Sequence, residues 1–374
     1  MVKKSIIALL VILAVMLSSC DSNAGPAAMS LETGGRMFEF STNVYSYYLS
    51  STKTRQLINM YAAVGISLEQ MRDIPELWDD EETAAEVKEQ AEFTMKQMLA
   101  IVAYCHERNL TLSAEQRDGI DRFINELINE AFGRSRTNFN NTLARFMINE
   151  NIFREMQRYE LMAGLVYSHL FEAETGTRII QPEVILAAYE ANFARFKHIV
   201  IMTETNERGV DGELIELTVE QRAEIRAGAQ DIYNQITESG NDADLFERLM
   251  AQRSADTQQI MLLQGYTVNE MSGLNEDLTS ALFDMEIGGV SMVETDGSIH
   301  IMRRYGLLPP DQTPDLSNQG NSIAQTMERS LRSLIVFEEL APYIENITVN
   351  TEEIASFSVK AADTMFDIWA WIGG

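Results

Sequence analysis

The chain has 374 residues, 45% hydrophobic and 23% charged, which is a globular rather than a disordered composition, long enough for two or three domains. Its 56 acidic and 29 basic residues give a formal net charge of −27, which excludes nucleic acid as an expected partner, because phosphate binding needs a basic face. An anionic bilayer would also repel this body, so any membrane attachment must come from something other than charge.

The first twenty residues, "MVKKSIIALLVILAVMLSSC", combine a basic start with an apolar run from Ile6 to Leu17. The run is too short to cross about 30 Å of hydrocarbon, so residues 1–19 are predicted to be a secretory signal. The ending Leu-Ser-Ser-Cys resembles the bacterial lipobox, and this resemblance implies a lipid on Cys20 and an extracytoplasmic protein anchored to the bacterial cell membrane. The alternative is an ordinary cleaved signal with a chance cysteine. Residues 20–35, with the polar start "DSNAGPAAMS" after Cys20, are predicted to be a tether.

With Cys20 assigned to a lipid, Cys105 is the remaining cysteine, so no intramolecular disulfide is expected. Cys105 falls in a helical pattern and is predicted to be a buried structural thiol. His106 follows it, but adjacent helix positions point about 100° apart, so the two side chains are not expected to form a pair.

Residues 36–195 are predicted to be almost entirely helical, from apolar positions three and four residues apart. Ser113 followed by Gln116 is a capping-box pattern for one helix start, and Gly133 is a plausible stop. An irregularity is expected near Asn149, and Pro182 is predicted in the first turn of a helix.

After Phe196 the pattern changes to strand, three helices and two strands, which predicts a compact α+β unit over residues 196–307. The last two strands are expected to pair around the turn Asp296-Gly297. Residues 308–374 are again predicted to be helical and to pack with the N-terminal region.

This unit resembles a parvulin-type peptidyl-prolyl isomerase domain. The family opens with a histidine followed by aliphatic residues, here Lys197-His198-Ile199-Val200, and continues with a helix ending in a serine-aspartate segment, here "DLFERLMAQRSAD". An alanine-phenylalanine helix and a glycine-valine strand start follow, here Ala281 to Phe283 and "IGGVSMV". A last strand with glycine, a hydrophobic residue and histidine closes the pattern, here "TDGSIHIM".

The order of the whole chain resembles the PrsA and SurA type of extracytoplasmic foldase. This implies an α+β protein with a helical chaperone region, an inserted parvulin-like domain and a C-terminal helix returning to the helical region. The lipobox favours the PrsA-like branch.

By this resemblance, His198 and His300 form a hydrogen-bonded pair across neighbouring strands, with Asp256 and Thr295 in the same catalytic network. A proline pocket would include Leu274, Leu278 and Phe283. No cofactor is expected, and no metal site either, because no further His or Cys ligands cluster nearby in the sequence.

The sequence departs from the family pattern in three places. Its glycine-aspartate-leucine-glycine segment is reduced to "GYTV" around Gly265, the pocket phenylalanine is replaced by Leu278, and the stretch from Asp256 to Gly265 is longer. The histidine pair could therefore be a structural hydrogen bond left in a silent domain.

Two functions stay open. The first is a membrane-anchored foldase that binds unfolded secreted polypeptides and catalyses prolyl isomerisation, and the second is a holdase chaperone with a silent parvulin domain. A third, a solute-binding lipoprotein, predicts two lobes of repeated strand-helix units, and the helical first half argues against it.

Overall fold

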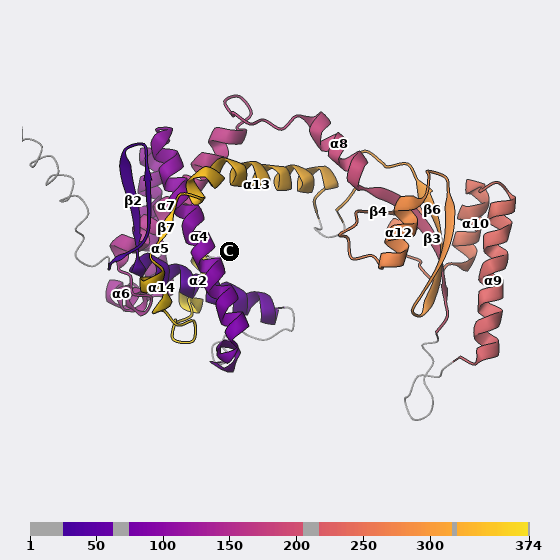
Figure 1. The fold of residues 1–374 in the computed structure, drawn as a ribbon, viewed down its shortest axis with the longest axis horizontal. Coiled ribbons are helices and arrows are strands. Elements are labelled where there is room, and N and C mark those ends of the chain that lie inside the picture. The colour runs from indigo at the N-terminus through magenta and orange to yellow at the C-terminus, as the bar shows by residue number, and fades with distance from the viewer. Residues whose placement is uncertain (1–24, 63–74, 205–216, 316–319, 373–374) are drawn as a thin grey trace, which may run out of the picture. The chain divides into compact units, whose positions relative to one another are not determined.

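The computed structural model describes residues 25–62, 75–204, 217–315 and 320–372 (Figure 1). The predicted signal and Cys20 lie outside these residues. None of the helices in the described part of the chain is both long and apolar enough to cross a membrane. The α+β class predicted from the sequence is confirmed, since helices surround two small antiparallel sheets.

The chain divides into two compact units, and the second interrupts the first in sequence. Unit 1 comprises residues 1–179 and 333–374, and unit 2 comprises residues 180–332. Unit 2 therefore extends beyond the predicted range 196–307 at both ends. At its start a buried tyrosine, Tyr189, lies 3.4 Å from the Thr313 hydroxyl, so flanking residues on both sides pack within the unit.

Unit 1 is mostly helical and carries a three-stranded sheet of order β2-β1-β7. Its elements before the insertion are β1 (Ala27–Thr33), β2 (Arg36–Ser41), α2 (Thr42–Ala62), the 3-10 helix η1 (Pro75–Asp79), α4 (Glu81–Glu107), α5 (Ala114–Ala131), α6 (Arg136–Arg145) and α7 (Glu150–Phe171). After the insertion come the end of α13 (Ile323–Ile344), β7 (Thr348–Val349), α14 (Thr351–Ala355) and α15 (Phe366–Ile372).

The tether predicted over residues 20–35 is wrong for residues 27–33, which form β1. Ala28, Met29 and Leu31 on this strand are at most 1% exposed, and they belong to the core of unit 1. The polar residues before β1 are typical of a linker. Ala28, Met29 and Leu31, however, are three apolar side chains within four positions, and their burial in the core stabilises a strand.

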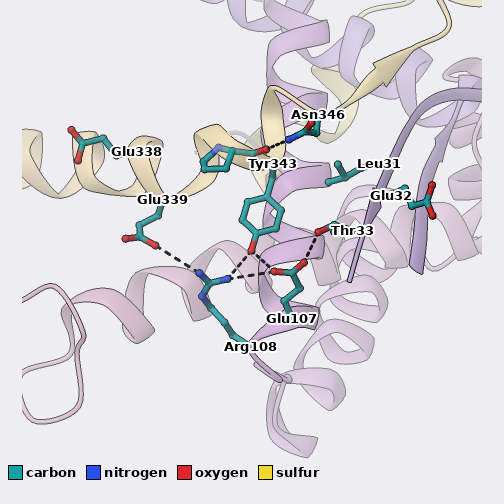
Figure 2. A pocket seen from close by; sticks show the side chains of 10 residues that line it. Leu31, Glu32, Thr33, Glu107, Arg108, Glu338, Glu339, Tyr343 and Asn346 are labelled. Carbon is teal, nitrogen blue, oxygen red and sulfur yellow. Dashed lines mark hydrogen bonds and ion pairs between the residues drawn. The ribbon is translucent and has the colours of Figure 1, made fainter. Parts of the chain in front are cut away.

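The C-terminal segment joins the same core as the first half of the chain. Leu340, Met365 and Ile368 lie in one buried cluster with residues of α2, α4, α5 and α7. A polar contact accompanies this packing: the Arg108 guanidinium donates to the Tyr343 hydroxyl at 2.7 Å, and Tyr343 donates to Glu107 at 2.6 Å (Figure 2). These side chains line a cavity of about 500 Å³ beside the end of α13.

Unit 2 is built on a four-stranded antiparallel sheet of order β4-β3-β6-β5. Helices cover both faces: α12 lies on one side of the sheet, and α9 and α10 lie on the other (Figure 1). The elements are α8 (Pro182–Asn192), β3 (Ala194–Met202), α9 (Val219–Glu238), α10 (Ala243–Arg253), α11 (Gln259–Leu263), β4 (Tyr266–Val268), α12 (Glu276–Asp284), β5 (Val290–Thr295), β6 (Ser298–Tyr305) and the start of α13.

The alternation of strand side chains divides β3 between two cores. Phe196 packs with Leu278 and Leu282 of α12, whereas Ile199 packs with Phe246 of α10. Because successive strand residues point to opposite faces, His198 lies on the same face as Phe196, which is the face covered by α12.

Candidate functional site

The antiparallel pairing of β3 with β6 brings the two predicted histidines together. His198 lies opposite Met302, and His300 lies opposite Val200, so the histidines are diagonal neighbours on one face of the sheet. Their Nδ1 atoms are 3.3 Å apart, which is the expected hydrogen bond across neighbouring strands. His198 is 7% exposed and His300 is partly buried.

Asp256 is held against His198 by the short segment that follows α10. The Val200 amide donates to the Ser254 hydroxyl at 3.0 Å, and the Ala255 amide donates to the Val200 carbonyl at 2.7 Å. These two bonds fix the segment along β3, next to the histidine. The Asp256 Oδ2 atom lies 2.9 Å from His198 Nε2.

The sequence prediction missed Tyr266, whose hydroxyl donates to Asp256 Oδ2 at 2.9 Å. Its position depends on Gly265, which has a φ of +79° and leaves no room for a Cβ, because that atom would lie 2.5 Å from the Phe196 carbonyl oxygen. The signal available in the sequence was a tyrosine directly after a glycine, a short distance from Asp256.

The network continues at the other end through Ser298, which the sequence prediction also missed. The Ser298 Oγ atom lies 2.8 Å from His300 Nε2 and 3.1 Å from the Thr295 hydroxyl. Thr295 and Ser298 flank the turn between β5 and β6, so the hairpin sets their separation. Thr295 therefore reaches the histidines only through Ser298.

Burial favours the neutral forms of both imidazoles. Burial and, to a smaller extent, the neighbouring His198 lower the pKa of His300 to about 4, while Asp256 acts in the opposite direction. Burial also lowers the pKa of His198, against the effect of the Asp256 carboxylate. For Asp256, burial raises the pKa, but the hydrogen bonds from His198, the Gln258 amide and Tyr266 together lower it below its ordinary value.

These protonation states give the hydrogen bonds one direction. The Asp256 carboxylate accepts, so His198 donates from Nε2 and its Nδ1 is free to accept. His300 then donates from Nδ1, and its Nε2 accepts from the Ser298 hydroxyl. The result is a continuous, oriented chain from Ser298 through two neutral imidazoles to a carboxylate.

The predicted pocket residues lie in the apolar cluster on the same face of the sheet. Leu274 and Phe283 are partly buried around a core that includes Phe196 and Met302. Leu278 belongs to that core and is only 3% exposed. The structure thus brings Leu274, Leu278 and Phe283 together, but Leu278 contributes to packing more than to an open surface.

No family model matches the sequence. A search among curated proteins also gives no match. Solved structures do match the chain, and the matches include foldase proteins called PrsA.

The chain is similar in fold to PrsA. The structure of foldase protein PrsA from Streptococcus pneumoniae covers 71% of this chain and 87% of its own, at 13% identity and a TM-score of 0.24. PrsA from Bacillus subtilis covers 78% and 92%, at 13% identity and a TM-score of 0.23. The peptidylprolyl isomerase PrsA from Bacillus anthracis covers 69% and 98%, at 13% identity and a TM-score of 0.26. At this level of similarity, a function for the chain has to rest on its own residues.

Proposed function

We propose that the protein is a membrane-anchored extracytoplasmic foldase. In this proposal unit 2 catalyses peptidyl-prolyl cis/trans isomerisation, and unit 1 binds unfolded secreted polypeptides. The observation that carries the enzymatic part is the continuous hydrogen-bonded chain from Ser298 to Asp256 beside the apolar cluster of Leu274, Leu278 and Phe283.

The chemistry of the reaction fits such a site. An X-Pro bond favours trans by only about 0.5–1 kcal/mol, but amide resonance imposes a barrier of about 18–20 kcal/mol. No nucleophile is needed, because the catalyst has only to bind the twisted amide better than the planar one. Apolar side chains can hold the proline ring, and oriented neutral donors and acceptors can stabilise the twisted amide next to it.

A prolyl isomerisation assay on a short X-Pro peptide tests the enzymatic part. We expect the wild-type chain to accelerate cis/trans exchange of the X-Pro bond. His300→Gln and Asp256→Asn should each reduce the acceleration at least about tenfold, which is the loss expected for one oriented group in such a site. His169→Gln is the matched control, because it makes the same chemical change on α7 of unit 1 and should leave the rate unchanged. A wild-type rate equal to the uncatalysed rate would refute the isomerase.

A second function, a holdase with a silent parvulin-like domain, is favoured by the burial of Leu278. At 3% exposure this side chain fills the core instead of presenting a surface to a proline ring. The holdase predicts that the chain suppresses aggregation of a proline-poor client, and that His300→Gln suppresses it equally well. Isomerase activity that depends on His300 would exclude it.

The membrane part of the proposal rests on Cys20, at the end of the apolar N-terminal run. We expect the chain expressed in bacteria to sediment with membranes and to carry a diacylglycerol mass on its N-terminal residue. Cys20→Ala should lose the added mass and appear in the extracytoplasmic soluble fraction. A Cys20→Ala variant that stays in the membrane with an unchanged mass would contradict the anchor.

A further inference from the structure

Unit 1, which the proposed function assigns to the binding of unfolded polypeptides, contains a cavity of about 710 Å³. It is bounded by β2, the C-terminal end of α4, the start of α5 and α7. The cavity lining combines three features: the free edge of a strand, cationic side chains, and an apolar wall that includes Leu99, Val102 and Met162.

The strand edge belongs to β2, the outermost strand in the order β2-β1-β7. Five consecutive residues of this strand, 36–40, line the cavity. Side chains of consecutive strand residues point to opposite faces, so one face alone cannot present all five. The cavity therefore runs along the edge of the strand. Among the residues that the structure describes, no further strand pairs with the N–H and C=O groups of this edge, so they can pair with an added strand.

Arg36 stands at the beginning of this edge. It shares a strand face with the buried Phe38 and Phe40, and its guanidinium lies 5.3 Å from the Phe38 ring centroid. Glu39 points to the other face by the same alternation. Arg36 therefore lies on the same face of β2 as Phe38, whereas Glu39 lines the cavity from the opposite face of the strand.

The partner of Arg36 is unusual in so acidic a chain. Its Nη1 atom lies 2.8 Å from His106 Nε2, so the guanidinium donates to an imidazole. Among the described residues, the structure gives Arg36 no carboxylate partner, although the chain carries 56 acidic residues. A second cation on the lining, Arg117, donates to the Leu112 carbonyl and likewise has no carboxylate partner within the described ranges.

The lining also holds two carboxylates, Glu39 and Glu155, and a third arginine, Arg158. Arg158 is paired with Glu155, with Nη1 at 2.8 Å and 3.1 Å from the two carboxylate oxygens. The cavity thus keeps two arginines available beside a free strand edge. A carboxylate could accept charge-assisted hydrogen bonds from a guanidinium there, in a protein whose charge is otherwise strongly negative.

We propose that this cavity binds an extended peptide that adds to the edge of β2 and places a carboxylate between Arg36 and Arg117. Strand addition supplies main-chain hydrogen bonds, and alternate side chains of the peptide face the apolar wall. The carboxylate comes from the peptide's C-terminus or from a glutamate side chain. The proposal rests on the polypeptide binding proposed for unit 1, and it holds whether or not unit 2 is an isomerase, because every residue it uses lies in unit 1.

Fluorescence anisotropy on the full chain tests the site with four labelled probes. The first is a short peptide of alternating valine and serine with one glutamate and a free C-terminus. The second has a C-terminal amide, the third has glutamine for glutamate, and the fourth keeps both carboxylates but is N-methylated at alternate backbone nitrogens. We expect the first probe to bind. Of the second and third probes, which each keep one carboxylate, one should bind about tenfold more weakly. The N-methylated probe should not bind, because it cannot donate the main-chain hydrogen bonds of an added strand.

Variants of the protein complete the test. Arg36→Gln and Arg117→Gln should each weaken binding of the first probe about tenfold, and added salt should weaken it as well. Arg122→Gln, on α5 but outside the lining, is the matched control and should leave binding unchanged. All three variants should keep the thermal unfolding temperature and any isomerase rate of the wild type, since these arginines are exposed and lie in unit 1.

Two results would overturn the proposal. Undiminished binding of both single-carboxylate probes, or binding unaffected by either arginine substitution, would remove the anionic subsite. Undiminished binding of the N-methylated probe would remove strand addition. Neither result would bear on the isomerisation assay, so failure of this site and failure of the proposed enzyme are distinguishable.

Discussion

His300 illustrates how one buried side chain makes the stability of its unit depend on pH. Burial, reinforced by His198, lowers its pKa to about 4, and the pKa of His198 is lowered as well. Well above the ordinary histidine pKa of about 6.5, both imidazoles are neutral in the folded and the unfolded chain. As the pH falls from there toward 4, the unfolded chain takes up protons first, so the free energy of unfolding decreases.

The measurement is urea unfolding of the wild type and of His300→Gln at about pH 7 and about pH 4.5. We expect the urea midpoint of unit 2 to fall between these values in the wild type and to fall less in the variant. The Asp256 carboxylate affects stability at lower pH than the histidines. Its pKa is depressed in the folded chain, so its contribution to the free energy of unfolding is lost only as the pH falls below about 4. A variant with the same pH dependence as the wild type would contradict the assignment to His300.

Tyr266 gives a second prediction at the residue scale. Tyr266→Phe removes the hydroxyl that donates to Asp256 Oδ2 and keeps the ring that packs in the apolar cluster. We expect a loss of about 1 kcal/mol in the free energy of unfolding, and a rise in the pKa of Asp256, since one of its hydrogen-bond donors is gone. Carboxyl titration by NMR would show the rise, and an unchanged Asp256 pKa would mean that the hydroxyl does not support the carboxylate.

At the scale of the element, the start of β4 depends on a single glycine. Gly265→Ala places a Cβ 2.5 Å from the Phe196 carbonyl oxygen, at a φ of +79° that L residues rarely adopt. We expect a loss of about 3 kcal/mol, from backbone strain together with overpacking, measured by urea unfolding. Gly228→Ala is the matched control. It lies in α9 with nothing within 4 Å of its new Cβ, and should gain about 1 kcal/mol of helix propensity.

Helix ends were the most predictable elements, because their signals are local. Ser113 and Gln116 form the expected capping box of α5, and α5 ends at Ala131, just before Gly133 with its φ of +58°. The expected irregularity near Asn149 is the break between α6 and α7, where the Asn149 side chain accepts from the Ile152 amide. Each of these features depends on side chains within a few residues of the helix end.

Short strands were predictable only where a partner was close in sequence. The β5–β6 hairpin is predictable because the sequence has a turn signal at Gly297, which has a φ of +84° in the structure. By contrast β1 pairs with β7, and Met29 meets Val349 more than three hundred residues later. Strand β4 has only three residues and depends on β3 for its register. Composition cannot reveal such pairings, because a strand of this length is stabilised mainly by its partner.

The candidate site shows the same division between local and distant information. A resemblance in the order of short motifs indicated His198, His300 and Asp256, which lie together in the structure. The two further members, Tyr266 and Ser298, join through side-chain hydrogen bonds that form only once the strands are in register. Ser298 has no such signal in the sequence, and Tyr266 is marked only by its place directly after Gly265.

At the scale of the molecule, the two units have separate cores. The cluster of unit 1 combines helices α2, α4, α5 and α7 with the C-terminal segment, and the two clusters of unit 2 lie on the two faces of its sheet. No residue is shared between the core of unit 1 and those of unit 2 among the residues that the structure describes. Helix α13 begins in unit 2 and ends in unit 1.

Separate cores predict two calorimetric transitions that can be shifted one at a time. Phe153→Ala empties a fully buried position in unit 1, and Phe246→Ala does the same in unit 2; each should cost about 3–5 kcal/mol. For units of this size, such a loss lowers the midpoint of the affected transition by about 10 °C and leaves the other in place. The transition shifted by Phe246→Ala should also be the one whose midpoint falls at low pH, because His198 and His300 belong to that unit. If both variants shift a single common transition, the units unfold cooperatively, and α13 transmits stability from one core to the other.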